Sequence, residues 1–129
     1  ESKRIFVVTT PEIPPLHLAR ERITLLRNLD IGDRVTVLLN RWQKRNAISV
    51  AQIEDLLEAP VYETFPNNYI GVHAALVAGR PIDPKTDLGK RFAALAQRIL
   101  SAQDARPARP KKSFLETFSI LPAKFPALR

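Results

Sequence analysis

The chain has 129 residues, a length that suits one compact domain, and apolar residues make up 45% of it. It contains no cysteine, which excludes disulfides, thiolate catalysis and cysteine metal sites within these residues. The histidines, His17 and His73, have no partner at metal-ligand spacing, so a metal site is not predicted. The net charge of +7 favours an acidic partner, either nucleic acid or an anionic membrane surface.

Targeting signals are not evident in the sequence. No run of about 18 apolar residues is present, which argues against a membrane-spanning helix. The apolar run before Pro11 is too short for the core of a signal peptide, so we expect a cytoplasmic protein. The chain has no methionine and begins at Glu1, and we therefore expect it to be a piece of a longer protein.

The first half of the chain alternates strand and helix patterns. Short apolar runs predict strands near residues 4–9 and 34–40, because such runs are bounded by turn formers. Between them, residues 15–28 have helical periodicity, and Asp30 and Gly32 are predicted to end this helix. Its apolar residues are three or four positions apart: Leu16, Ala19, Ile23 and Leu26.

The alternation continues in the second half. Ser49 and Gln52 resemble a capping box at the start of a helix, and a third strand is predicted near residues 60–65. Asn67 is predicted to cap the next helix, which Gly79 ends. The three predicted helical stripes are Val50, Ile53, Leu56 and Leu57, then Ile70, Ala74 and Val77, and finally Leu88, Phe92, Leu95 and Ile99.

This order of elements predicts an α/β fold with a parallel sheet of three strands joined by crossover helices. The strands are apolar throughout, as in sheets that are covered on both faces. A sheet of three strands is narrow and is typical of half of a doubly wound domain. At least one of its edge strands is expected to need a further element to cover it. We place this domain at residues 1–103 and a basic, proline-containing linker with an amphipathic tail at residues 104–129.

Polar residues and turn formers follow each predicted strand, in "VTTPE", "LLNRW" and "TFPNNY". Ligands of open parallel sheets bind outside the carboxyl ends of the strands. The amide of Asn40 can donate and accept a hydrogen bond at once, which suits the edge of an adenine ring. Pro66 and Asn67 offer backbone groups and a flat apolar surface for the same ring. An asparagine that ends a strand is also a common turn former.

In this order, "VVTTPEIPPLHLARE", "VTVLLNRW", "APVYETFPNNYIGVHAALVAGRPI" and "LGKRFAALAQRIL" resemble the C-terminal half of a MinD/ParA-type P-loop ATPase. The stretches "NRWQKRNAIS" and "FPNNY" are most similar to the CpaE/TadZ branch, which is associated with pilus assembly and polar localisation. The resemblance covers about residues 4–103 and rests on the ordered set, because no single motif in it is specific.

The resemblance implies that Asn40 reads the adenine of ATP, that Pro66 and Asn67 form the turn beside it, and that Arg41 flanks the base. It also implies an ATP-dependent face-to-face dimer, with His17 and Arg20 as surface contributors, although a solvated helix start is the preferred explanation for each of these two residues. Pilus-assembly or polar-localisation proteins are the further partners that it implies.

The departure from the family is large. Its phosphate site is a glycine-rich loop with a lysine, and Mg²⁺ is held by segments that this chain does not match. The four glycines here are not clustered. These residues are therefore not expected to hydrolyse ATP without an N-terminal half that supplies the phosphate and Mg²⁺ sites, and whether the longer protein is an enzyme stays open.

Two other functions compete with this interpretation. A non-catalytic localisation or interaction scaffold of the same fold would have the same sequence features in this half. A basic nucleic-acid-binding module would use its cations as a phosphate-contacting face, although no helix-turn-helix or RNA-binding motif is evident, and nonspecific DNA is the weaker expectation. The cations concerned are Arg4, Arg34, Arg41, Lys44, Arg45, Arg80, Lys85, Lys90 and Arg91.

The tail contains an amphipathic segment, "KKSFLETFSIL", which is similar to the terminal segment of MinD relatives except at Glu116 and in the trailing "PAKFPALR". At about 100° per residue its large apolar side chains share one face. One hypothesis is a reversible helix at the anionic inner face of the membrane. The other is that the segment docks on the domain itself or on a partner protein. The residues are Lys111, Lys112, Phe114, Leu115, Phe118 and Leu121.

Overall fold

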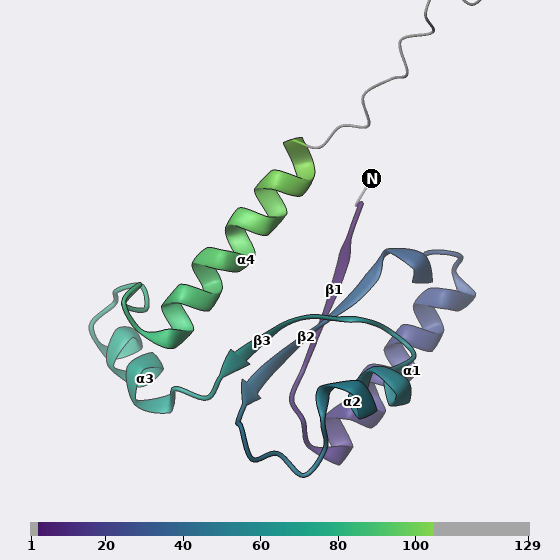
Figure 1. The fold of residues 1–129 in the computed structure, drawn as a ribbon, viewed down its shortest axis with the longest axis horizontal. Helices are drawn as coiled ribbons and strands as arrows, with labels where there is room; N and C mark the ends of the chain where they lie inside the picture. Colours follow the sequence, from purple (N-terminus) through teal and green to yellow (C-terminus); the bar gives the residue numbers. More distant parts are fainter. Residues whose placement is uncertain (1–2, 105–129) are drawn as a thin grey trace, which may run out of the picture.

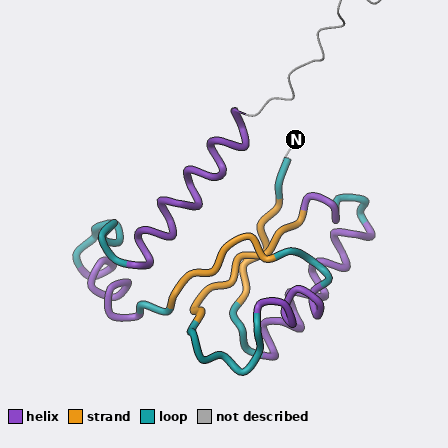
Figure 2. The backbone as a smooth tube through the Cα atoms, viewed as in Figure 1, coloured by secondary structure: helices purple, strands orange, loops and turns teal. Residues whose placement is uncertain are grey.

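The computed structural model describes residues 3–104 and shows a parallel sheet with helices on both faces (Figure 1). Its strands are β1 (Ile5–Thr9), β2 (Val35–Trp42) and β3 (Val61–Pro66), which lie side by side in the order β1-β2-β3 (Figure 2). Both strand pairs are parallel. The predicted α/β class and the three predicted strands are confirmed.

One face of the sheet is covered by α1 (Ile13–Asn28) and α2 (Val50–Leu57). Both β-α-β connections step in the same direction across the sheet, and right-handed crossovers then put both helices on the same face. We call this the closed face. Its buried residues come from both helices, from the alternate positions of β2 and from the turn after α2: Leu16, Ala19, Ile23, Val35, Val37, Leu39, Ile53, Leu57 and Ala59.

The ends of these helices follow their local sequence. Pro14 lies in the first turn of α1, where its missing N–H is not needed. The helix ends at Asn28, and the chain turns through Asp30, whose φ of 57° is left-handed, into the 3-10 turn η1 (Gly32–Arg34). The Ser49 capping box of α2 is confirmed, since the Ser49 hydroxyl accepts from the Gln52 N–H and the Gln52 side chain accepts from the Ser49 N–H.

The opposite face carries a smaller core and is covered by α4 (Asp87–Asp104), which packs against β3. We call this the half-covered face. Leu38, Phe65 and Leu88 are buried there, with Leu95 packed against them. Val8 of β1 points to the same face and is 62% exposed, so the expectation that both faces are covered fails over β1 in the described part of the chain.

Four expectations about the helices are corrected. Leu56 is at the solvent edge of α2, whereas Ile53 and Leu57 are buried and Val50 packs against the core. The outer part of the α4 stripe is looser than predicted, since Phe92 is about half exposed. Helix α3 (Tyr69–Val77) buries none of its residues, so Ile70 and Val77 are solvent-exposed and not core.

The fourth correction concerns the start of α3. Asn68, not Asn67, is its N-cap, and its side chain accepts from the Gly71 N–H at 3.0 Å. The reason is that the Asn67 N–H still belongs to the sheet, where it donates to the carbonyl of Trp42. Gly79, with a φ of +58°, follows α3 as predicted.

Helix α4 extends to Asp104, one residue past the predicted end of the domain. The predicted linker and the tail residues from Lys111 to Leu121 lie outside the described residues, so the membrane hypothesis stays a prediction. Within residues 3–104, no helix combines the length and the apolar character that a bilayer crossing requires.

Candidate functional site

The carboxyl end of β2 is irregular. Leu39 pairs with Thr64 and Trp42 with Pro66, so β2 advances three residues where β3 advances two. The extra residue is a β-bulge at Asn40 and Arg41, a feature that re-aims side chains and is common beside active sites. Arg41 has a φ of 55°, and the Oδ1 of Asn40 accepts from its backbone N–H at 2.9 Å. Both side chains are exposed at the end of the sheet.

The carboxyl end of β3 lies directly beside this bulge. Pro66 is the register partner of Trp42, and the Asn67 N–H donates to the Trp42 carbonyl at 3.2 Å. The sheet therefore brings the sequence-predicted residues of β2, Asn40 and Arg41, next to those of β3, Pro66 and Asn67. Their roles in binding stay predictions.

This arrangement fits the edge of a purine base. An asparagine amide can pair with adenine through its N6 amino group and N7. The Asn40 Oδ1 holds the Arg41 N–H with one lone pair, which leaves the Nδ2 donor and the second lone pair for a ligand. The neighbouring Pro66 adds an apolar surface. These residues thus match the chemistry of base recognition, whereas donors for phosphates are not gathered beside them by a glycine-rich loop.

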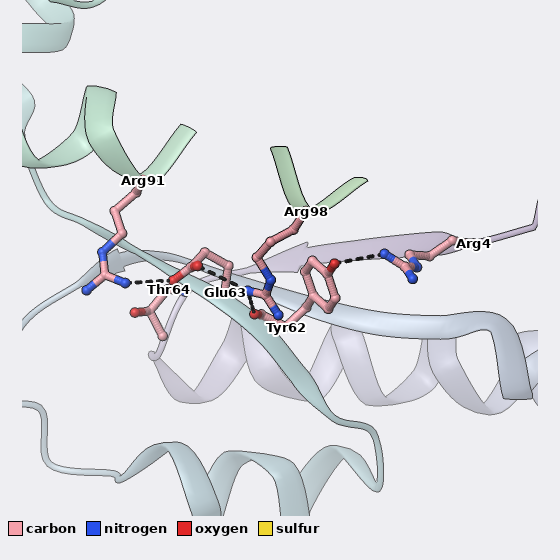
Figure 3. Close-up of polar contacts among 6 residues, drawn as sticks. All are labelled: Arg4, Tyr62, Glu63, Thr64, Arg91 and Arg98. Atoms are coloured by element: carbon pink, nitrogen blue, oxygen red, sulfur yellow. Dashed lines mark hydrogen bonds and ion pairs between the residues drawn. The ribbon is translucent and has the colours of Figure 1, made fainter. Parts of the chain in front are cut away.

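A second polar cluster, not foreseen from the sequence, joins β3 to α4 and β1 (Figure 3). The carboxylate of Glu63, only 11% exposed, binds Arg91 at 3.0 Å and Arg98 at 3.3 Å. Arg98 lies over the Tyr62 ring at 3.9 Å and donates to the Tyr62 carbonyl, while Arg4 donates to the Tyr62 hydroxyl. We call these five residues the Glu63 cluster.

A bulge explains how β3 presents this cluster. Val37 pairs with Val61 and Leu38 with Glu63, so here the extra residue lies in β3, at Tyr62. Tyr62 packs toward the half-covered face, and Glu63 meets α4 on that face as well. One sequence signal was present: Arg91 and Arg98 are seven residues apart on one helical face, opposite a strand with a single carboxylate.

The predicted phosphate-contacting cations do not form one surface. Arg4 and Arg34 precede β1 and β2, whereas Arg41, Lys44 and Arg45 lie at or beyond the other end of β2. Arg4 and Arg91 are engaged within the protein, since Arg4 binds Tyr62 and Arg91 binds Glu63. Parallel strands therefore separate the set between opposite ends of the sheet, and this weakens the nucleic-acid interpretation.

His17 and Arg20 lie on an exposed side of α1. His17 is 3.4 Å from Glu21 one turn along the helix, and Arg20 is 3.9 Å from Glu58. Their exposure agrees with solvated surface residues. Across residues 3–104, no group of three or more histidine, aspartate or glutamate side chains is placed to hold a metal ion.

The fold defines the chain as an α/β protein with a parallel sheet and crossover helices, and a solved structure shares it. That structure is a ParA family ATPase from Chlorobium tepidum TLS, with a TM-score of 0.69 and 23% sequence identity. The match covers 74% of this chain and 41% of the ParA chain, so this chain spans less than half of that protein. No family model matches the sequence, and no curated protein does.

The likeness in structure supports the ParA/MinD-type fold that the sequence motifs suggested. At 23% identity it concerns the fold alone, so activity and partners do not follow from it.

Proposed function

We propose that this chain is the base-recognising half of a ParA/MinD-type nucleotide-binding protein, in which Asn40 reads adenine beside Pro66 and Asn67. The observation that carries the proposal is the Asn40 bulge, which holds an exposed amide next to the turn of the neighbouring strand. Arg41 would flank the base on its open side.

The phosphates and Mg²⁺ would be bound by residues outside this chain. The open edge of β1 supports this division. Among the described residues β1 pairs with β2 alone, and a shallow pocket lies along β1 and α1, with Val8, Leu18 and Arg22 in its lining. A further strand on this edge would extend the sheet, and a helix packed on the half-covered face would cover Val8. A protein so completed would bind ATP, and it would self-associate through the face on which the strands end.

The CpaE/TadZ-like stretches support the proposal of a role for such a protein in subcellular localisation or pilus assembly. "NRWQKRNAIS" contains the Asn40 bulge, and "FPNNY" contains the β3 turn and the Asn68 cap. The motifs that carry this branch of the proposal are therefore the same residues that form the candidate site. The proposal assigns no hydrolytic step to the residues of this chain.

The test is nucleotide affinity of the longer protein that carries this chain. Asn40→Ala removes the partner of the base edge, and an unpaired base edge costs about 1–3 kcal/mol, or roughly 5- to 150-fold in affinity. We expect this loss for ATP, measured by calorimetry, and a much smaller one for inorganic triphosphate, which has no base.

The matched control is Asn28→Ala, which removes an exposed asparagine at the far end of α1. It should leave ATP affinity unchanged. Equal affinity for ATP and GTP, together with an Asn40→Ala variant that binds as the parent does, would show that the base is not read here.

A further inference from the structure

Helix α3 has an apolar stripe that faces solvent. Its members recur at helical spacing within an arc of about 120°, at 100° per residue. Large apolar residues on a surface helix ordinarily face the core. The stripe consists of Tyr69, Ile70, His73, Leu76 and Val77, and its four large hydrophobic residues are between 73% and 82% exposed. The rings of Tyr69 and His73 stack at 6.0 Å, which makes the first turn of the stripe one continuous surface.

The remainder of a larger sheet would leave this stripe uncovered. The inner side of α3 already packs on the domain, through Val72 against the core of the half-covered face. The open edge of the sheet is at β1, whereas α3 follows β3 at the other edge (Figure 1). New strands added beside β1 therefore extend away from α3.

We propose that the stripe of α3 is the docking surface for residues 114–121 of this same chain. The four large apolar residues of that segment are Phe114, Leu115, Phe118 and Leu121, spaced i, i+1, i+4 and i+7. Tyr69, Ile70, His73 and Leu76 have the same spacing. As helices the two stripes would be of similar length, about 12 Å each at 1.5 Å per residue. Apolar stripes of equal length and pattern bury each other along a shared seam.

The connection between the two must be nearly extended. Helix α4 has 18 residues, so its C-terminal end, where residue 105 follows, is about 27 Å from the end that adjoins α3. The nine residues 105–113 can span about 30 Å when extended, and Pro107 and Pro110 favour extended backbone. This span is close to the full length of the connection, so docking within one chain requires an extended linker, and a dependence on chain concentration distinguishes it from docking between chains.

Hydrogen exchange of the full 129-residue chain tests the proposal. Amides of residues 115–121 should exchange at least tenfold more slowly than those of a free peptide of the same sequence. The double variant Ile70→Glu/Leu76→Glu should return them to the peptide rate, because both side chains lie in the stripe. Both positions are highly exposed, so the variant leaves the core intact.

A matched control changes two exposed leucines of α1, Leu18→Glu/Leu25→Glu, and should leave the protection in place. The absence of protection in the parent chain overturns the proposal, and so does protection that survives Ile70→Glu/Leu76→Glu. Protection that appears only as the chain concentration rises would assign the contact to a second copy and overturn docking within the chain.

Sedimentation with anionic phosphatidylglycerol vesicles tests the alternative that the segment binds a membrane surface. If residues 115–121 are unprotected in solution and become protected when the chain sediments with the vesicles, the segment is a membrane-surface helix and the proposal is wrong. If docking on α3 is correct, Ile70→Glu/Leu76→Glu should increase sedimentation with the vesicles, because it releases the apolar face of the segment.

Discussion

The two faces of the sheet differ in how completely they are packed, although the same strands build both. The closed face has two helices and nine buried residues, and the half-covered face has one helix on β3 and three buried residues. Electrostatic contacts differ as well. The side chain of Glu58, which forms ion pairs beside the closed face, is 61% exposed. The side chain of Glu63 on the half-covered face is 11% exposed. Stability and binding capacity are thus separated between the faces.

This difference indicates which surfaces of the chain are available to bind a partner. A sheet face that is already buried by α1 and α2 has little apolar surface left to offer. Of the twelve large hydrophobic residues that are exposed within residues 3–104, seven lie on β1, α3 and α4, namely Val8, Tyr69, Ile70, Leu76, Val77, Phe92 and Leu100. Each prediction below compares matched positions in these two regions.

The largest expected effect is on the closed face. Leu39→Ala removes a fully buried side chain from the centre of β2 and should lower the free energy of unfolding by about 2–5 kcal/mol. Val8→Ala, on the neighbouring strand but exposed, should change it by about 0.5 kcal/mol or less. Urea denaturation at constant m-value measures both. A costly Val8→Ala would mean that the β1 face is covered in solution.

The next effect compares the two carboxylates. Glu63→Ala removes hydrogen bonds between a nearly buried carboxylate and two arginines, which should cost about 1.5–3 kcal/mol. Glu58→Ala breaks an exposed pair with Arg27, for which about 0–1 kcal/mol is expected. In 1 M salt, the loss of unfolding free energy caused by Glu58→Ala should decrease more than the loss caused by Glu63→Ala. Equal losses for both variants would contradict the assignment of Glu63 as the tie between β3 and α4.

The fold was predictable because its signals are local. Apolar runs bounded by turn formers located all three strands, and the spacing of Leu16, Ala19 and Ile23 located α1 and its buried side. The Ser49 capping box needs only two residues three positions apart, so the sequence showed it directly. Parallel pairing followed from the alternation of strands and helices.

The candidate site was predictable only in part. Residues at the ends of neighbouring parallel strands must meet, and this placed Asn40 near Pro66. The bulges at Tyr62 and at Asn40 were not foreseen, because register depends on contacts between strands and not on the pattern within one strand. The Glu63 cluster was not foreseen for the same reason, because it depends on the bulge at Tyr62. The exposure of the α3 stripe was not foreseen, since periodicity identifies an apolar face but not what covers it.

The smallest effect compares two helix caps. Ser49→Ala removes the hydroxyl that caps α2 on the closed face, and Asn68→Ala removes the amide that caps α3. Each cap contributes about 1 kcal/mol to its own helix. Because Ile53 and Leu57 of α2 are fully buried, loss of the Ser49 cap should lower global stability by that amount. Helix α3 buries no residue, so loss of the Asn68 cap should instead appear as faster hydrogen exchange in residues 71–77, with the unfolding midpoint nearly unchanged. If Asn68→Ala lowers the unfolding midpoint as much as Ser49→Ala does, α3 unfolds together with the core. The contrast between the two regions would then be smaller than the described residues indicate.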